Sequence, residues 1–137
     1  MDNELRAKID MCSQTAETFT SLYYNAVDKR RHQVSRLYLD NATYIWNGNP
    51  FIGKDKIQSF FLELPASEHN ITTLDAQPII DESMTGTTTV IIKAAGTIKY
   101  QDQPTKAFCQ TFVVTAVENK WKIASDIFRL QEVASDS

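Results

Sequence analysis

The chain has 137 residues, of which 42% are hydrophobic and 23% charged, and it carries a formal net charge of −3 with an isoelectric point near 5.3. A chain of this length can bury a core without disulfides or a metal, so we expect one domain over residues 1–137 and no cofactor. The excess of acidic residues disfavours direct binding to nucleic acid, because phosphate recognition depends on clustered Lys and Arg.

The cysteines and the first residues bear on the compartment. Cys12 and Cys109 lie far apart and form no CxxC pair, and the first ten residues are too polar for a secretory signal. No apolar run reaches the length of a membrane span, and neither end carries a lipidation motif. We therefore expect reduced thiols in an intracellular protein with no membrane partner.

Helical periodicity dominates the first 38 residues. Apolar residues spaced by four and three predict a long helix with one buried stripe, formed by Leu5, Ile9, Cys12, Ala16, Phe19, Tyr23 and Ala26. The cations at residues 29–31 match the dipole of the helix end, and the alternative is an acidic contact surface. A second short helix is expected over residues 33–38, before a turn at residues 40 and 41.

The next segment predicts a small hairpin followed by a helix. Residues 43–46 and 51–52 have strand character and are joined by the turn residues 47–50. A helix over residues 54–64 would place Ile57, Phe60, Phe61 and Leu64 on one face, and Pro65 would end it.

From residue 71 onward the pattern predicts strands. Residues 71–80 alternate loosely, Pro78 indicates an edge strand or a bulge, and residues 81–86 form a loop. A long strand over residues 88–100 has one apolar face, on which Gly96 marks a bend or bulge. Residues 101–104 lead into a final hairpin. Helices followed by an antiparallel sheet predict an α+β fold.

The final hairpin, residues 108–130, has two runs of β-branched and aromatic residues separated by residues 118–120. With a two-residue turn at 119–120, antiparallel pairing predicts one face made of Gln110, Phe112, Val114, Ala116, Ile123, Ser125, Ile127 and Arg129. The other face would carry residues such as Val113, Asp126 and Phe128. Both faces are partly apolar and this chain can cover one of them, so the other predicts a protein partner.

Arg129 shares the first face with Phe112 and Ile127 in this register. An arginine among apolar side chains is costly unless a carboxylate pairs with its guanidinium, and a partner chain would supply that carboxylate. The alternative is a solvated arginine at the edge of the face.

Candidate residues for chemistry are few. The sequence has no phosphate-cradling glycine loop, metal-ligand cluster or nucleophile elbow. His32 and His69 have no ligand partner at metal spacing and are interpreted as surface or capping residues, and Cys109 has no neighbouring base. Asp126 is either a general base in a pocket or a structural carboxylate, and we favour the structural role.

An ordered set of short motifs resembles the nuclear transport factor 2 family. The motifs are Phe19-x-x-x-Tyr23-Tyr24-x-x-x-Asp28-x-x-Arg31, Leu37-Tyr38, Trp46-x-Gly48-x-x-Phe51-x-Gly53-Lys54, Leu64-Pro65, Gln77-Pro78, Phe108-x-Gln110-x-Phe112 and Asp126-x-Phe128-Arg129. Each motif alone is weak, but their order over residues 19–129 is specific. The resemblance implies three helices packed in a strongly curved, mostly antiparallel sheet that dimerises through its outer face.

In this family the import carrier for the GTPase Ran in its GDP form uses acidic residues at the mouth of its cavity. The aligned positions in this chain are Asn47, Gln101 and Gln103, so all three charges are absent. Because a site that attracts cations loses that attraction when its carboxylates become amides, the sequence does not support binding of Ran-GDP.

The closer resemblance is to the nuclear transport factor 2-related export proteins, through residues 28–31, 45–49 and 121–126. It implies a non-enzymatic small subunit that forms a heterodimer with the similar domain of the large messenger RNA export receptor. The predicted interface residues come from the hairpin face described above and are Arg129, Ile127, Phe112, Gln110, Val114 and Ser125. The resemblance adds that the arginine of the Asp-x-Phe-Arg motif forms a salt bridge across the interface. The implied setting is the nucleus and nuclear envelope, with shuttling to the cytoplasm and passage of the complex through the FG-repeat nucleoporins of the nuclear pore.

Two alternatives belong to other classes of protein. One is a homodimeric carrier for Ran-GDP, which the three amides disfavour. The other is a small-molecule isomerase or dehydratase of the same fold, which would need a buried carboxylate, Tyr or His constellation around an open cavity.

Overall fold

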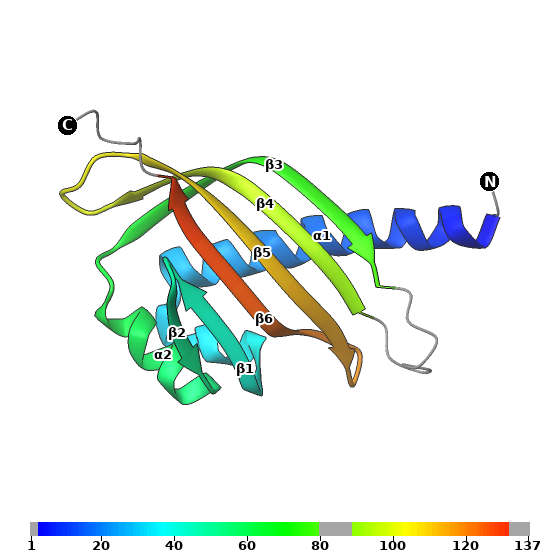
Figure 1. Ribbon diagram of the computed structural model, residues 1–137, viewed down its shortest axis with the longest axis horizontal. Coiled ribbons are helices and arrows are strands. Elements are labelled where there is room, and N and C mark those ends of the chain that lie inside the picture. The colour runs from blue at the N-terminus through cyan, green and yellow to red at the C-terminus, as the bar shows by residue number, and fades with distance from the viewer. Residues whose placement is uncertain (1–2, 80–88, 132–137) are drawn as a thin grey trace.

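A long helix lies across the inner face of a curled six-stranded sheet in the computed structural model, which describes residues 3–79 and 89–131 (Figure 1). The helices are α1 (Asn3–Lys29), the 3-10 helix η1 (Arg31–Leu37) and α2 (Lys54–Glu63). The strands are β1 (Tyr38–Trp46), β2 (Asn49–Ile52), β3 (Ser67–Pro78), β4 (Thr89–Tyr100), β5 (Lys106–Val117) and β6 (Lys120–Gln131).

The strands are ordered β2-β1-β6-β5-β4-β3, and β1 runs parallel to β6 while the other described neighbours are antiparallel. This arrangement confirms the predicted α+β fold of three helices in a mostly antiparallel curved sheet. β3 lies at an edge, as Pro78 indicated. The loop predicted at residues 81–86 lies outside the described residues.

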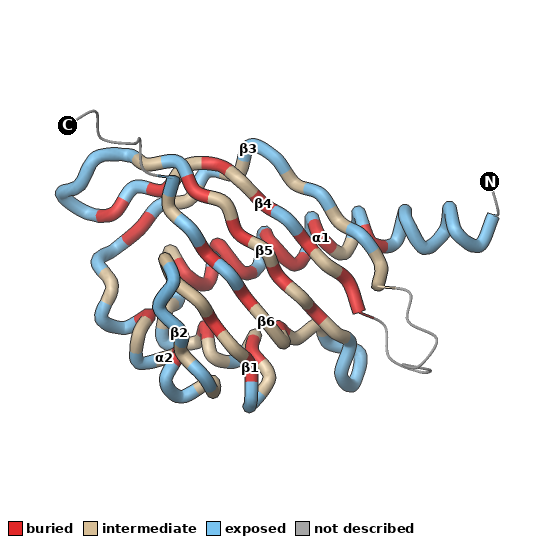
Figure 2. Tube along the Cα trace, in the orientation of Figure 1, coloured by how far each residue is buried: buried red, intermediate tan, exposed pale blue. Residues whose placement is uncertain are grey.

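The core lies between α1 and the inner face of the sheet. The Phe19 and Tyr23 rings of α1 contact Phe112 of β5, with centroid distances of 5.7 and 4.8 Å. The predicted stripe is buried from Cys12 onward, but Leu5 and Ile9 are 37% and 38% exposed. They are exposed because the first turns of α1 extend past the end of the sheet (Figures 1 and 2).

The end of α1 is tied to the chain that follows α2. The guanidinium of Arg31 donates to the carbonyls of Phe61, Leu64 and Pro65 and to the hydroxyl of Ser67. Its Nε donates to the carbonyl of Val27. Arg31, one of the three cations predicted to match the helix dipole, is therefore half-buried and connects two segments by hydrogen bonds. The other two, Lys29 and Arg30, are exposed.

The turn predicted at residues 40 and 41 is wrong, since both lie inside β1. Asp40 and Asn41 are exposed, whereas Ala42 and Tyr44 of the same strand are buried. The register against β6 shifts between Tyr38 and Thr43, so the polar pair occupies an irregular part of the strand. Tertiary pairing has outweighed the local preference of Asp and Asn for turns.

The predicted register of the β5–β6 hairpin is also wrong, and a β-bulge is the reason. The turn residues are Glu118 and Asn119, with φ of 50° and 66°, so the turn lies one residue earlier than predicted. That change alone moves the register by two residues and keeps every side chain on its face. The bulge then moves the register back by one residue, because Val113 pairs with Ser125 and Val114 with Ile123. Beyond it the pairs lie one residue from the predicted register, which places the side chains of β6 on the opposite faces.

The bulge separates the predicted interface residues onto two faces. Gln110, Phe112 and Val114 are 2%, 0% and 0% exposed on the inner face, where α1 covers them. Beyond the bulge, Asp126 and Phe128 join that inner face, and Ser125, Ile127 and Arg129 lie on the outer face. The prediction that all six residues share one face was wrong, and only the last three are placed to meet a partner on the outer face of the sheet.

Gly96 faces a second bulge, as its position in the strand predicted. It pairs with Ile71 of β3, and the register of β3 shifts between Ile71 and Thr73. A Cβ on Gly96 would lie 1.9 Å from the carbonyl oxygen of Asn70, closer than two such atoms can approach. The close approach of the β3 backbone to β4 at this bulge therefore requires glycine.

We expect Gly96→Ala to lower the free energy of unfolding by about 2–3 kcal/mol, because the backbone of β3 has to move. Gly48→Ala is the matched control: its site has open space but a φ of +84°, which isolates backbone strain without a clash. The control should lose about 1 kcal/mol. Urea denaturation measures both, and equal losses would show that β3 yields freely at Gly96.

Candidate interaction surface

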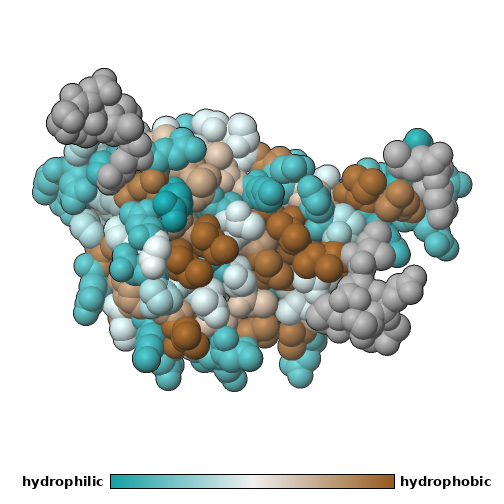
Figure 3. All heavy atoms as spheres, viewed as in Figure 1, coloured by the Kyte–Doolittle hydropathy of each residue, from teal (hydrophilic) through white to brown (hydrophobic). Residues whose placement is uncertain are grey.

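The outer face of the sheet carries apolar side chains from four strands. Ile45 of β1 pairs with Ile127 of β6, and in the neighbouring row Ile91 of β4 pairs with Val113 of β5. Ile127 is 44% exposed, and the other three are half-buried. Figure 3 shows these strands from outside, with hydrophobic atoms gathered across the middle of the face and hydrophilic atoms around it. None of the described helices covers this side (Figure 1).

Arg129 lies at one side of this apolar patch. It pairs with Cys109 of β5 and stands two residues beyond Ile127 on the same face. Its side chain is exposed, and it forms no ion pair with any residue in the ranges 3–79 and 89–131. Within these ranges no carboxylate pairs with the guanidinium, whose planar geometry suits bidentate contact with a carboxylate. Ser125, paired with Val113, lies on the other side of Ile127.

The inner face holds a polar network that the sequence did not predict. Asp126 is fully buried, and its Oδ2 accepts hydrogen bonds from the hydroxyls of Tyr38 at 2.7 Å and Tyr23 at 3.0 Å. Its Oδ1 accepts from Nε2 of Gln110 at 2.7 Å. The hydroxyl of Tyr24 donates to Oε1 of Gln110 at 2.7 Å, and Nε2 of Gln110 also donates to the hydroxyl of Tyr23 at 3.2 Å.

Burial sets the ionisation of this network. Removal from water raises the pKa of Asp126 to about 7, although the hydrogen bonds from Gln110, Tyr38 and Tyr23 act in the opposite direction. Burial, together with the nearby Asp126 carboxylate, also raises the pKa of Tyr23 and Tyr38 well above its ordinary value. Their hydroxyls stay protonated and donate, which fits the structural role favoured for Asp126.

Among residues 3–79 and 89–131, the network lies beside a narrow gap and not an open cavity. The gap enclosed by α1, α2 and the inner face of the curled sheet has a volume of about 10 Å³. That is about the minimum for a single water molecule. Aromatic rings fill the remainder, with Tyr44, Phe108, Phe112 and Phe128 among the side chains at most 3% exposed. The constellation needed by a small-molecule enzyme is therefore present without room for a substrate.

The two histidines have different environments. His32 is exposed, as predicted, but His69 is not a surface residue: its side chain is 4% exposed, and its Nδ1 lies 2.7 Å from Oδ1 of Asp28. Burial raises the pKa of the Asp28 carboxyl, but its hydrogen bonds and charge interaction with His69 prevail and hold that pKa below the ordinary value. No group of metal-binding side chains occurs among the described residues.

The positions aligned with the Ran-binding acids lie at one end of the sheet, in the β1–β2 turn and the β4–β5 loop (Figure 1). The Oδ1 of Asn47 accepts the backbone N–H of Leu130 at 2.8 Å, so this amide holds the turn against β6. Gln101 and Gln103 are exposed. None of the three supplies a negative charge.

The sequence of this chain is similar to those of known nuclear transport proteins. Residues 15–130 match the family described as the nuclear transport factor 2 (NTF2) domain. The chain belongs to the nuclear transport factor 2 family. The human protein named NTF2-related export protein 2 is 40% identical over 136 residues, which cover 96% of each chain.

Solved structures of nuclear transport factor 2-like proteins share the fold. Nuclear transport factor 2 of Cryptosporidium parvum superposes with a TM-score of 0.78 at 23% identity, covering 88% of this chain and 95% of that one. A chain in the crystal structure of the C. albicans Mtr2-Mex67 M domain complex superposes with a TM-score of 0.70 at 19% identity, covering 92% of this chain and 99% of that one. No helix within residues 3–79 or 89–131 has the length and apolar character to cross a membrane.

Proposed function

We propose that this chain is a non-enzymatic cofactor of nuclear messenger RNA export. It pairs through the outer face of its sheet with the nuclear transport factor 2-like domain of a large RNA export receptor. The observation that carries the proposal is the apolar outer face, with Ile127 exposed and Arg129 unpaired among the described residues, in a chain 40% identical to a protein named for export.

None of the described helices covers this apolar face (Figure 1). An exposed apolar sheet face invites association, and an obligate interface resembles a protein core divided in two. The chain completes and stabilises the receptor's domain in this proposal. The complex then passes the FG-repeat nucleoporins of the nuclear pore, which places the chain in the nucleus and nuclear envelope with shuttling to the cytoplasm. It requires no cofactor and no direct contact with RNA or membrane.

Purification of the tagged full chain from nuclear extract tests the proposal. We expect a stoichiometric partner that contains a nuclear transport factor 2-like domain, and its loss when Ile127→Asp places a charge in the apolar patch. Leu62→Asp is the matched control, because Leu62 is 58% exposed on α2, which does not contribute to the outer face. Recovery of the same partner with Ile127→Asp would contradict the assigned face.

We expect the isolated chain to self-associate or precipitate, because the patch of Ile45, Ile91, Val113 and Ile127 is then open to water. Coexpression with the partner domain should give a monodisperse heterodimer. Sedimentation velocity at increasing concentration measures the difference. A stable monomer at all working concentrations would argue strongly against the heterodimer.

Ran-GDP is expected not to bind measurably, because Asn47, Gln101 and Gln103 carry no charge. The triple variant Asn47→Glu, Gln101→Asp, Gln103→Asp should gain weak binding that decreases with salt. Calorimetric titration measures the affinity of the parent chain and of the triple variant for Ran-GDP. Micromolar binding by the parent chain would favour the import carrier instead.

A further inference from the structure

Strand β3 forms one edge of the sheet, and it is long enough to recruit another strand (Figure 1). It has 12 residues, whereas β2 at the opposite edge has four, one of which is Pro50. An edge strand presents backbone N–H and C=O groups along its free side, and a strand of another chain can pair with them. The free side of β3 is therefore a candidate site for strand addition.

The register identifies which backbone groups of β3 point away from β4. In an antiparallel pair, every second residue directs its N–H and C=O away from the neighbouring strand. From residue 69 onward, the pairing with β4 and the bulge place five residues in this class, His69, Ile71, Leu74, Ala76 and Pro78. Four of them carry an outward N–H, because proline has none.

Two of these N–H groups already have a carboxylate acceptor. The N–H of His69 donates to Oδ2 of Asp28 on α1 at 2.9 Å, and the N–H of Ala76 donates to Oδ1 of Asp75 at 3.0 Å. Pro78, the last residue of the strand, offers no donor. A strand that approached this edge would thus meet no available N–H at three of the five positions, and its carbonyls would face the negative charge of two carboxylates.

The bulge interrupts the edge between the two remaining donors. Ile71 and Leu74 lie on either side of it, three residues apart instead of the usual two. Thr72, within the bulge, donates its hydroxyl to the carbonyl of Ala95 at 3.2 Å, which holds the irregular backbone against β4. A regular added strand could not match both donors at this spacing.

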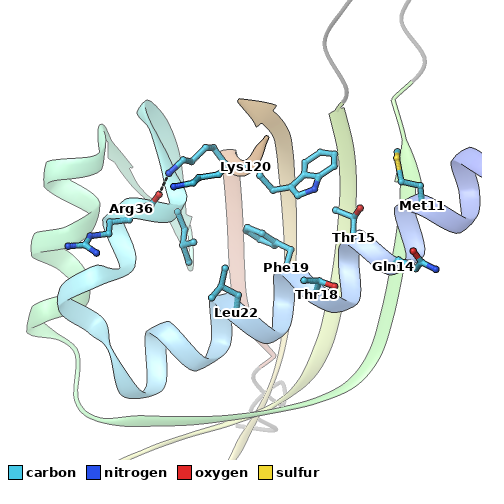
Figure 4. Close-up of a pocket in the computed structure, with 11 residues that line it drawn as sticks. Met11, Gln14, Thr15, Thr18, Phe19, Leu22, Arg36 and Lys120 are labelled. Carbon is cyan, nitrogen blue, oxygen red and sulfur yellow. Dashed lines mark hydrogen bonds between the residues drawn. The ribbon is translucent and has the colours of Figure 1, made fainter. Parts of the chain in front are cut away.

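We propose that the two carboxylates, the proline and the bulge close the free edge of β3 to pairing with a strand of a second copy, so that the folded chain associates through its other surfaces. Charged side chains, proline and bulges each hinder edge-to-edge pairing of sheets. In this chain they follow one another over residues 69–78. The groove in Figure 4 is separate from this edge, because its described lining residues belong to α1, η1 and β6. The proposal does not rest on the proposed export function.

The first test opens the edge in the full chain. Every protein carries Ile127→Asp, to suppress association through the outer patch. Asp75→Thr together with Pro78→Thr removes one carboxylate and restores an N–H to the edge. Glu63→Thr together with Pro104→Thr is the matched control, because it makes the same change in charge and proline content at two exposed positions away from the edge. Thioflavin T fluorescence is followed below the temperature at which circular dichroism shows unfolding.

We expect the fluorescence to increase with time in the edge variant and to stay at its starting value in the parent and in the control. The infrared band of intermolecular β-sheet should appear with it. The proposal is overturned if the parent forms such aggregates as readily as the edge variant. It is also overturned if the edge variant behaves like the control.

Amide exchange tests the Asp75 cap without requiring aggregation. Asp75→Ala removes the acceptor of the Ala76 N–H, so this amide should exchange about two- to tenfold faster, which corresponds to one net hydrogen bond. Asp75→Asn keeps an acceptor oxygen and should exchange much like the parent. Asp75 is exposed, so neither substitution disturbs the core. The rates are read by NMR on the full chain labelled with 15N. Equal exchange of Ala76 in Asp75→Ala and the parent would show that the carboxylate does not cap this edge, and would overturn the proposal.

Discussion

Asp126→Ala is expected to lower the free energy of unfolding by about 3–5 kcal/mol, because it leaves three buried donors without their acceptor. The hydroxyls of Tyr23 and Tyr38 and the amide of Gln110 all donate to this carboxylate, which is 0% exposed. The removed atoms also leave a cavity. Urea denaturation at pH 6 measures the loss, and the midpoint should move with little change in its slope.

Asp126→Asn is the matched control, because it keeps the size of the side chain and an oxygen that accepts from both tyrosines. Its NH2 group would face Nε2 of Gln110, and rotation of the Gln110 amide by half a turn presents Oε1 to it instead. Tyr24 then has to accept where it now donates. We expect a loss below about 1.5 kcal/mol at pH 6. If alanine and asparagine were equally stable at that pH, the hydrogen bonds of Asp126 would have no net value.

The same residue gives the protein a specific dependence on pH. The pKa of Asp126 is raised to about 7 in the folded chain from its ordinary value of 3.8, so the folded state binds the extra proton between those values. Stability from this group is therefore complete below about pH 4 and decreases as the pH rises through 7, by at most about 1.4 kcal/mol for each pH unit. Asp126→Asn should remove that slope. Denaturation of both proteins from pH 4 to 8 tests this, and parallel profiles would contradict it.

The sequence predicted the elements well where local signals decide them. Helix α2 was expected over residues 54–64 and ends at Glu63, and the turn at residues 47 and 48 has the positive φ values that Asn-Gly favours. By contrast, the sequence did not predict which side chains of β6 lie on which face of the sheet. Val113 and Val114 look alike in sequence, yet the single bulge beside them inverts every later side chain of β6. No residue type in that stretch requires a bulge, so periodicity alone could not locate it.

The buried network was missed for a different reason. Tyr23 and Asp126 are 103 residues apart, and their contact depends on the path of α1 across the sheet. Two signals were available: Gln110 is an amide within an otherwise apolar run of β5, and Asp126 interrupts β6. A buried amide and a buried carboxyl both require partners, so together they indicated a shared site. Tyr23, one of the tyrosines that complete the network, was assigned to the core by its helical spacing.

Arg129→Ala is expected to weaken the proposed heterodimer by about 2–5 kcal/mol, because it would leave the partner's acid buried without its pair. The structure changes the surroundings of this arginine from those predicted: it shares the outer face with Ile127 and Ser125, and Phe112 lies on the opposite side of the sheet. The expectation survives this change, since Arg129 is exposed beside the apolar patch and forms no ion pair with another described residue.

Three substitutions and one control distinguish a buried pair from a solvated edge arginine. Arg129→Asp should weaken the heterodimer more than alanine through repulsion between like charges, and Arg129→Lys should retain part of the affinity, because an ammonium group cannot make the bidentate contact of a guanidinium. Lys56→Ala on α2 also removes an exposed cation, but away from the outer face, and should have no effect. Heterodimer affinity is measured for each variant after circular dichroism has confirmed its folding. Affinities within about twofold of the parent for all three Arg129 variants would mean that the arginine stays solvated, as surface ion pairs contribute little.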